Sequence, residues 1–351
     1  MRMNDFKTHR GFTLLELMVS MALGLVVMGA MASLFRMGMS STFLVAQRAE
    51  TQQNMRAAIE LIGKDVSMAG AGLPTGGIQL PVGGTQVRFG CDQTGICYPT
   101  SNLFPANHMF GIIPGFTGGV QGNALIAAAT TRRNDAITVI YADYNFPLWE
   151  YDIAFPAPKD GTSITLTPNP TFVPAPPALN SAGGIQVGDL IMLSNSSTAV
   201  GEVTNVTATA ITFSNLDALN MNQSGATGNN IASIANGAPT IAYRLSAVTY
   251  YLSVPAAGQL PRLMRQVNGQ FPVPVADDII NLQFAYDVSN PGGTDPNQPN
   301  PLGVAESPNL IQKVNVWVMG QSMTQDGNHA QSMYLATSVS ARNMSFRDRY
   351  K

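Results

Sequence analysis

The sequence predicts an α+β protein in which one long N-terminal helix, transmembrane and then amphipathic, packs on a predominantly antiparallel β-sheet domain with long loops. Three observations predict this class. An apolar run near the N-terminus continues into a segment of helical periodicity. All 23 prolines lie at or after Pro74. Beyond that point, β-branched segments alternate with turn-forming Gly and Pro. The chain therefore divides near residues 69–74 into a helical part and a β-rich part.

The composition excludes several classes of protein. Of the 351 residues, 45% are hydrophobic and 11% are charged, whereas a disordered chain has high charge and few apolar residues. The 19 Lys+Arg nearly balance the 21 Asp+Glu, so there is no broad basic surface and we expect no nucleic-acid partner. The 33 glycines and 23 prolines favour loops and turns over a helix bundle.

The N-terminal segment predicts a membrane anchor. Residues 12–35 contain a single charged side chain, Glu16, and as a helix they would span about 36 Å, enough to cross a bilayer. Arg2, Lys7 and Arg10 precede this run, which predicts a cytoplasmic N-terminus and export of the rest. The run is too long for a cleaved secretory signal and has no convincing small-residue cleavage site. A plain signal anchor is the simplest alternative.

Glu16 is unusual within this run. A carboxylate costs on the order of 2.5–3.5 kcal/mol at the centre of a spanning helix, and less towards its end. Acids inside a membrane therefore usually have a partner, and a plain signal anchor does not explain this residue.

The motif GFTLLEL, which begins at Gly11, resembles the processing motif of type IV prepilins and type II secretion pseudopilins. The resemblance implies that a prepilin peptidase cuts between Gly11 and Phe12, that Phe12 becomes the methylated N-terminus, and that the apolar helix is retained. It divides the N-terminal part into a leader peptide (residues 1–11) and a pilin helix (residues 12–70), of which residues 12–35 are transmembrane.

The resemblance also implies an assembly role for Glu16 rather than a catalytic one. If the carboxylate of one subunit meets the Phe12 ammonium of its neighbour, two costly charges neutralise each other when subunits stack. An unpaired charge would disfavour the wrong register.

Beyond the membrane the helix is expected to continue to about Ala69. Apolar residues recur there at spacings of four, three and four, which predicts a stripe that packs on the chain's own globular domain. These residues are Met55, Ile59, Ile62 and Val66. The charged residues are expected to fall largely off the stripe; they are Arg48, Glu50, Arg56, Glu60, Lys64 and Asp65. Gly70 and Gly72, followed by Pro74, are expected to stop the helix.

The exported domain, residues 71–351, is predicted to be rich in β-strands. Enrichment in β-branched residues predicts strands at residues 135–141, 189–193, 200–206, 241–254, 279–288, 314–319 and 334–340. Long loops are expected at residues 71–134, 147–185, 214–239 and 289–309. The two tryptophans, Trp149 and Trp317, are expected in the core.

Several strand segments resemble those of PilW-type minor pilins. They are RNDAITVIYAD, VGDLIMLSNSSTAVGEVTNV, YRLSAVTYYLSVPAAGQLPRLMRQVNG, ADDIINLQFAYDV and VNVWVMGQSM. The resemblance implies a non-enzymatic structural subunit, incorporated near the tip of a type IV pilus, where it helps to start assembly. It implies as partners the prepilin peptidase, the inner-membrane assembly platform, other minor and major pilins, and a tip adhesin. It also implies a single-pass inner-membrane protein with a periplasmic globular domain, which then reaches the pilus on the cell surface.

Three alternatives stay open. A J-type minor pseudopilin of a type II secretion system shares the N-terminal motif but usually has a smaller domain. A membrane-anchored exported binding module would never polymerise. An exported hydrolase is disfavoured, because the sequence contains no G-x-S-x-G, H-E-x-x-H or phosphate-loop motif. No cofactor is predicted.

Cys91 and Cys97 are the only cysteines. Export would place them in an oxidising compartment, where a disulfide persists. Closing so short a loop would stabilise the fold by about 2.4 kcal/mol on the chain-entropy model. Two free buried thiols are the alternative. Zinc is not expected, because no nearby histidine completes a ligand set.

Two pairs of carboxylates could bind calcium in loops, namely Asp277 with Asp278 and Asp143 with Asp152. Neither pair has the spacing of an EF-hand. Solvated carboxylates at strand ends are the simpler interpretation.

Overall fold

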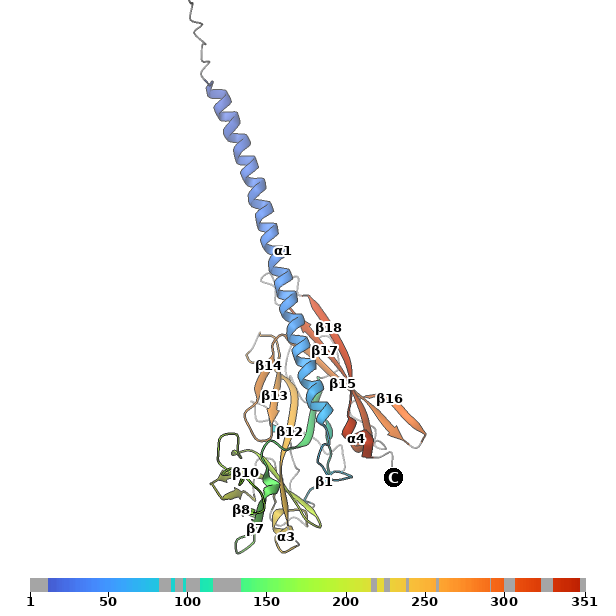
Figure 1. Ribbon diagram of the computed structural model, residues 1–351. Helices are drawn as coiled ribbons and strands as arrows, with labels where there is room; N and C mark the ends of the chain where they lie inside the picture. Colours follow the sequence, from blue (N-terminus) through green and yellow to red (C-terminus); the bar gives the residue numbers. More distant parts are fainter. Residues whose placement is uncertain are drawn as a thin grey trace, which may run out of the picture.

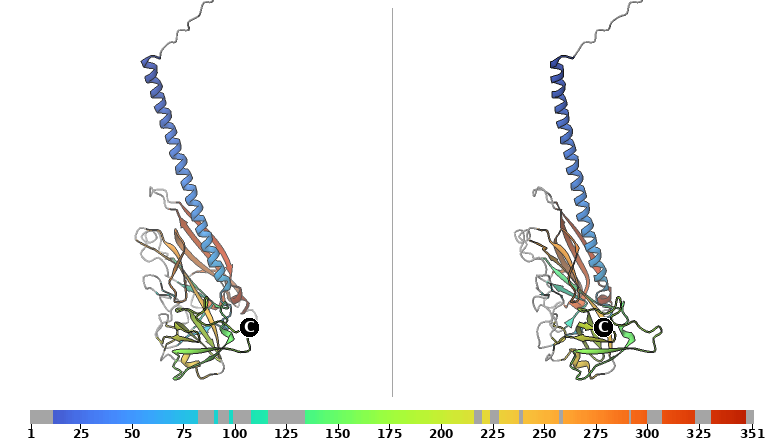
Figure 2. Two further views of the ribbon diagram at one scale, coloured as in Figure 1. Left: turned by 60° about the vertical axis from the view of Figure 1, so that its left-hand side comes forward. Right: turned by 90° about the vertical axis from the view of Figure 1, so that its left-hand side faces the viewer.

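The computed structural model describes residues 12–81, 90–91, 97–98, 108–115, 134–215, 220–223, 228–237, 240–256, 259–290, 292–299, 307–322 and 331–347. Helix α1 (Leu14–Met68) has 55 residues and extends as a long rod from the β domain (Figures 1 and 2). At a rise of 1.5 Å per residue its length is about 82 Å. The predicted helix and the predicted fold class are both confirmed.

Helix α1 ends just before two glycines in a left-handed backbone conformation. Gly70 and Gly72 have φ values of +76° and +71°, a left-handed conformation that glycine adopts without steric penalty. The N–H of Gly70 donates to the carbonyl of Ile140 at 2.9 Å, and the N–H of Ala142 donates to the carbonyl of Ala71 at 2.8 Å. The chain that follows α1 is therefore bonded directly to the β domain.

The larger of the two main sheets has ten strands, all in antiparallel pairs. Eight of them lie in the order β14 (Val273–Ala276), β13 (Arg262–Val267), β12 (Ile241–Ser253), β9 (Leu190–Ser194), β10 (Thr198–Val206), β11 (Ala210–Phe213), β8 (Ser163–Pro168) and β7 (Tyr151–Ala154). β6 (Ala136–Asp143) pairs with β12, and β5 (Ile112–Gly115) pairs with β6.

The second main sheet has four antiparallel strands in the order β16 (Gly293–Pro299), β15 (Ile279–Asn290), β17 (Ile311–Gln321) and β18 (Ser332–Ser340). Two small two-stranded sheets are β1 (Ile78–Gln79) with β4 (His108–Met109) and β2 (Gly90–Cys91) with β3 (Cys97–Tyr98). Short helices are η1 (Leu148–Glu150), α3 (Ile231–Ile234), η2 (Pro308–Leu310) and α4 (Arg342–Arg347).

All seven predicted strand segments form strands, whereas all four expected loops are wrong in part. The segment 71–134 contains β1 to β5, the segment 147–185 contains β7 and β8, the segment 214–239 contains α3, and the segment 289–309 contains β16. β11, β13 and β14 were also not predicted. These strands are two to seven residues long and have weak local signals, so pairing with a neighbour rather than propensity decides their conformation.

Strand β12 joins two lobes of the β domain. Its first half, Ile241–Leu245, pairs with β9, and its second half, Val248–Ser253, pairs with β13 on the same edge. Asn268 bridges the gap between β9 and β13. Its side-chain oxygen accepts the N–H of Ala247 at 2.7 Å, and its side-chain nitrogen donates to the carbonyl of Leu245 at 2.8 Å. Hydrogen bonds from this buried side chain to the backbone of β12 thus take the place of strand pairing at the junction.

Each lobe has its own apolar core. The helix core joins the second half of α1 to both main sheets; its largest fully buried side chains include Met55, Ile62, Ile112, Ile137, Tyr250 and Tyr286. The distal core lies among β7 to β11, α3 and the start of β12; its members include Leu148, Ile164, Leu166, Ile211, Phe213 and Ile231. The predicted stripe is confirmed, since Met55, Ile62 and Val66 are at most 1% exposed and Ile59 packs against the same core.

The two tryptophans are not in the core, contrary to expectation. Trp149 and Trp317 are each 37% exposed. On β17 the neighbours Val316 and Val318 are buried, so the alternation of side chains along the strand turns Trp317 to the opposite face. Trp149 lies against Tyr144, with ring centroids 5.5 Å apart.

Candidate assembly and processing site

The N-terminal end of α1 is closed by a capping box. Thr13 is the N-cap residue, and its hydroxyl oxygen accepts the N–H of Glu16 at 3.3 Å. The Glu16 carboxylate in turn accepts the backbone N–H of Thr13 at 3.0 Å and its hydroxyl at 3.1 Å. Each side chain therefore satisfies an N–H group that the helix leaves unpaired. The carboxylate also lies where the helix dipole favours negative charge.

This geometry gives Glu16 a local partner that the sequence analysis missed. The signal was present, because the pattern T-x-x-E before an apolar run is a capping-box signature. Phe12, the residue expected to carry the mature ammonium, is 88% exposed and adjoins Thr13. Gly11 lies outside the described residues. Cleavage between Gly11 and Phe12, methylation of Phe12 and contact between subunits stay predictions.

The first half of α1 has no partner within the described part of the chain. Every side chain from residue 12 to residue 43 is exposed. An 18-residue stretch of this helix has a mean hydropathy of 2.1. Among the described residues, α1 is the one helix long and apolar enough to cross a membrane. Gly24, Gly29 and Gly38 do not interrupt it. This surface is suited to lipid or to the apolar helices of other subunits.

The second half of α1 is fixed to the β domain by a buried polar cluster around Asp65. The Asp65 carboxylate accepts the hydroxyl of Tyr250 at 2.5 Å and that of Tyr141 at 3.2 Å, and it pairs with Arg265 at 3.1 Å. Its side chain is 4% exposed. The expectation that Asp65 falls off the buried face is wrong, because three partners from β6, β12 and β13 compensate the cost of its burial.

The surroundings of the two tyrosines in the cluster raise the pKa of both hydroxyls. Burial, followed by the negative charge of Asp65, raises the pKa of Tyr141 to about 12. The same two causes raise the pKa of Tyr250 still further above its usual value. Both hydroxyls therefore stay protonated at neutral pH and act as donors to Asp65. The cluster holds a helix in place, and its residues have no arrangement of nucleophile and base that would suit catalysis.

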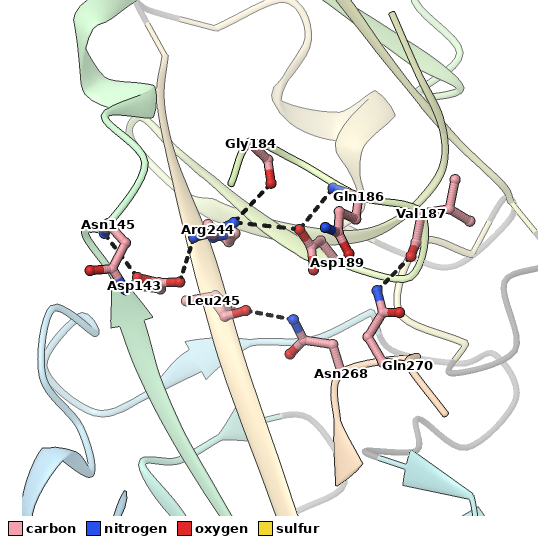
Figure 3. Close-up of polar contacts among 10 residues, drawn as sticks. All are labelled: Asp143, Asn145, Gly184, Gln186, Val187, Asp189, Arg244, Leu245, Asn268 and Gln270. Atoms are coloured by element: carbon pink, nitrogen blue, oxygen red, sulfur yellow. Dashed lines mark hydrogen bonds and ion pairs between the residues drawn. The ribbon is translucent and has the colours of Figure 1, made fainter. Parts of the chain in front are cut away.

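A second polar network, partly buried, lies at the junction of the lobes (Figure 3). Arg244 of β12 pairs with Asp143 of β6 at 2.7 Å and lies 3.8 Å from Asp189. It also donates to the carbonyl of Gly184 at 3.1 Å. Burial raises the pKa of Asp189, although the N–H of Gln186 and the charge of Arg244 oppose this shift. The network ties the loop before β9 to two strands and so fixes the distal lobe.

Three of the four carboxylates in the calcium hypothesis have other partners. Asp143 is paired with Arg244, whereas Asp152 accepts the side-chain amide of Asn169 at 3.0 Å. Asp277 pairs with Arg262 at 2.7 Å. In the part of the chain that the structure describes, no group of three or more His, Cys, Asp or Glu residues could hold a metal ion.

The backbone register sets Cys91 directly opposite Cys97 across the β2–β3 pair. Directly opposed residues in an antiparallel pair have Cα atoms about 4.5–5.5 Å apart, within the range of a disulfide. The side chains of both residues lie outside the described part, so the disulfide stays a prediction.

The comparisons with known proteins concern the N-terminal segment. A family model described as the prokaryotic N-terminal methylation motif matches residues 6–32. Neither the curated proteins nor the solved structures give a match. The matched segment covers the predicted cleavage site, Phe12, the capping box and much of the exposed apolar half of α1. A motif of this type implies processing by a prepilin peptidase and association with a pilus-type assembly machinery. Together with the exposed N-terminal helix, it supports a type IV pilin-like or pseudopilin-like protein anchored in a membrane by one helix.

Proposed function

We propose that this chain is a structural minor pilin of a type IV pilus, similar to PilW-type subunits. The observation that carries the proposal is the division of α1 into two halves. One half is packed into the chain's own domain, and the other presents an uncovered apolar surface preceded by a methylation motif. A subunit that moves from the membrane into a filament needs such a surface, because other helices replace the lipid on assembly.

The shape of the molecule favours a position near the tip. The β domain is elongated, and its distal lobe lies at the end remote from the exposed half of α1 (Figure 1). A subunit within the shaft has neighbours above and below it. At the tip the distal lobe stays free to contact an adhesin, and this subunit would then help to start assembly and act in adhesion and twitching motility.

Two rivals make different predictions. A J-type pseudopilin would be required for protein secretion rather than for pili, and a binding module that never polymerises would stay in the membrane. The absence of catalytic motifs in the sequence favours all three structural roles over an exported hydrolase.

The deciding experiment locates the processed chain. Mass spectrometry of membranes and of sheared pili is expected to find N-methyl-Phe12 as the first residue in both fractions, with a low copy number in the pili. Deletion of the gene should reduce piliation and leave type II secretion intact. An N-terminus at Met1, a chain confined to membranes, or a secretion defect with normal pili would contradict the proposal.

A further inference from the structure

Strand β18 forms an open sheet edge that lacks the usual protection. The other terminal strands of the two main sheets are β16, β14, β7 and β5, and β5 has four residues, one of them a proline. β16 contains two prolines and an aspartate, β14 contains a proline, and β7 has only four residues. β18 has nine residues, SMYLATSVS, without a charge or a proline. Its nine pairs with β17 run without a bulge. Long, flat and uncharged edges are normally avoided, because they pair with other chains.

The hydrogen-bond pattern shows which backbone groups face outward. The N–H of Ser322 donates to the carbonyl of Gln331 at 3.0 Å, and the N–H of Ala341 donates to the carbonyl of Gln312 at 2.8 Å. Both pairs belong to the β17–β18 register, in which bonded and non-bonded pairs alternate. Odd-numbered residues of β18 therefore bond to β17. The N–H and C=O groups of the even-numbered residues point away from β17, where no strand of the described part pairs with them.

The face beside this edge is also suited to contact. Tyr334 is 81% exposed on β18, opposite Met319 in the register, and Trp317 is 37% exposed two residues away on β17, opposite Ala336. Aromatic side chains are enriched at protein interfaces. The opposite face of β18 is occupied, because Met333 and Leu335 pack against the helix core.

The direction of β18 indicates which partner can reach it. Arg48 of α1 bonds Gln331 at the start of the strand, and a Cβ at Gly63 would lie 3.5 Å from Val339 near its end. β18 therefore runs beside α1 and in the same direction (Figure 1). It begins just beyond the exposed apolar half of the helix. A subunit that packs its own helix against that half would bring its globular domain level with β18.

We infer that the open edge of β18 is completed by an extended strand from a neighbouring pilin-type subunit. The inference rests on the proposed function and deepens it, because it names the surface by which the subunit selects its neighbour. Backbone hydrogen bonds to Tyr334, Ala336 and Ser338 give the affinity, and Tyr334 with Trp317 provides apolar contact.

The test removes one outward N–H. Ala336→Pro deletes a donor that β17 does not use, and proline is tolerated on an edge whose N–H faces solvent. Ala336→Thr is the matched control, since it keeps the N–H and adds a β-branched side chain. A benzophenone amino acid at Ser338 of the full-length chain, irradiated in whole cells, reports the partner. The expected adduct is with a different chain that carries the methylation motif. Its yield should fall about tenfold with Ala336→Pro and stay unchanged with Ala336→Thr.

A yield unaffected by Ala336→Pro would overturn the inference, as would an adduct with a protein that lacks the motif or with a second copy of this chain. Equal protease resistance of the two Ala336 variants in membranes shows that the proline has not unfolded the domain. If the proline variant is unfolded, Ala336→Lys is tested instead, because it keeps the fold and opposes edge pairing by its charge. The failure of the proposed function is distinct: the wild-type chain would then be missing from sheared pili whatever the edge binds in the membrane.

Discussion

The two halves of α1 belong to one continuous helix and have opposite surroundings. From residue 12 to residue 43 every side chain is exposed, whereas Met55, Ala58, Ile62 and Val66 are at most 1% exposed. The difference lies in the pattern of the residues. The first half is apolar on all sides and no single domain can cover it. The second half is apolar on one stripe, which one domain covers completely.

The two halves of the helix therefore differ in what can cover them. The second half packs on its own chain, so its contribution can be measured as folding stability. The first half has no partner in the described part of the chain and is suited to lipid or to other subunits, so we expect its contribution to be measurable as assembly. Substitutions in the two halves should therefore change different observables.

The largest effect is expected for Glu16 in assembly. Glu16→Ala should leave insertion and processing intact and prevent incorporation into pili, because the Phe12 ammonium of a neighbour would stay buried without a counter-charge. Breaking a buried pair from one side costs about 3–5 kcal/mol, a hundredfold or more in the equilibrium. Immunoblots of membranes and sheared pili measure both steps.

Glu16→Gln separates pairing from capping. Glutamine keeps the oxygen that accepts the Thr13 N–H but carries no charge. If the charge pairs between subunits, Glu16→Gln fails like Glu16→Ala. If Glu16→Gln is incorporated as well as the wild type, assembly requires the capping box and not the ion pair.

The second prediction compares two truncations in the same helix. Ile62→Ala should destabilise the β domain by about 3 kcal/mol, because Ile62 is fully buried in the helix core and its loss leaves a cavity. Leu25→Ala removes a side chain that is 70% exposed and should change unfolding by less than about 0.5 kcal/mol. Denaturant unfolding of the full-length chain in detergent, followed by tyrosine fluorescence, measures both. Equal losses for the two variants would mean that the halves do not differ as described.

The third prediction concerns the polar cluster that holds the second half. Asp65→Asn should destabilise the domain by about 2 kcal/mol, because Arg265 loses its counter-charge while one tyrosine hydroxyl keeps an acceptor. The figure is at the low end for a buried pair, since the Arg265 side chain is 26% exposed. Arg48→Gln, at an exposed position of the same helix, is the control and should cost far less in the same unfolding assay. A neutral Asp65→Asn would show that packing alone fixes the helix.

The smallest effect is expected from pH. The folded-state pKa of Tyr141 is raised from 10.0 to about 12, first by burial and then by Asp65. The folded protein therefore retains a proton that the unfolded chain loses, so the stabilisation is complete below pH 10 and is lost as the pH rises towards 12. Allowing for partial exposure of the side chain, the Tyr141 share is about 1 kcal/mol. Melting temperatures between pH 9 and pH 12 should fall less steeply for Tyr141→Phe than for the wild type. Parallel curves would refute this role.

Candidate site residues are easier to find from the sequence at the N-terminus than in the β domain. Phe12 and Glu16 stand in a short contiguous motif, and the stripe from Met55 to Val66 follows helical periodicity, so both can be found without knowing the fold. Thr13 belongs to the same local class, although its capping role was not recognised. Asp65 was misassigned because its partners, Tyr141, Tyr250 and Arg265, lie far away in the sequence.

Features that depend on neighbours along the chain can be read from the sequence. These are the helix and its end at the Gly70 turn, the change from an apolar run to a stripe, the methylation motif and the seven strongest strands. The pairing of strands cannot be read in this way, because register and order depend on contacts between distant segments. That pairing buried Asp65 among three partners, set Asn268 into the gap beside β12, turned Trp317 outward, and left β18 at an open edge.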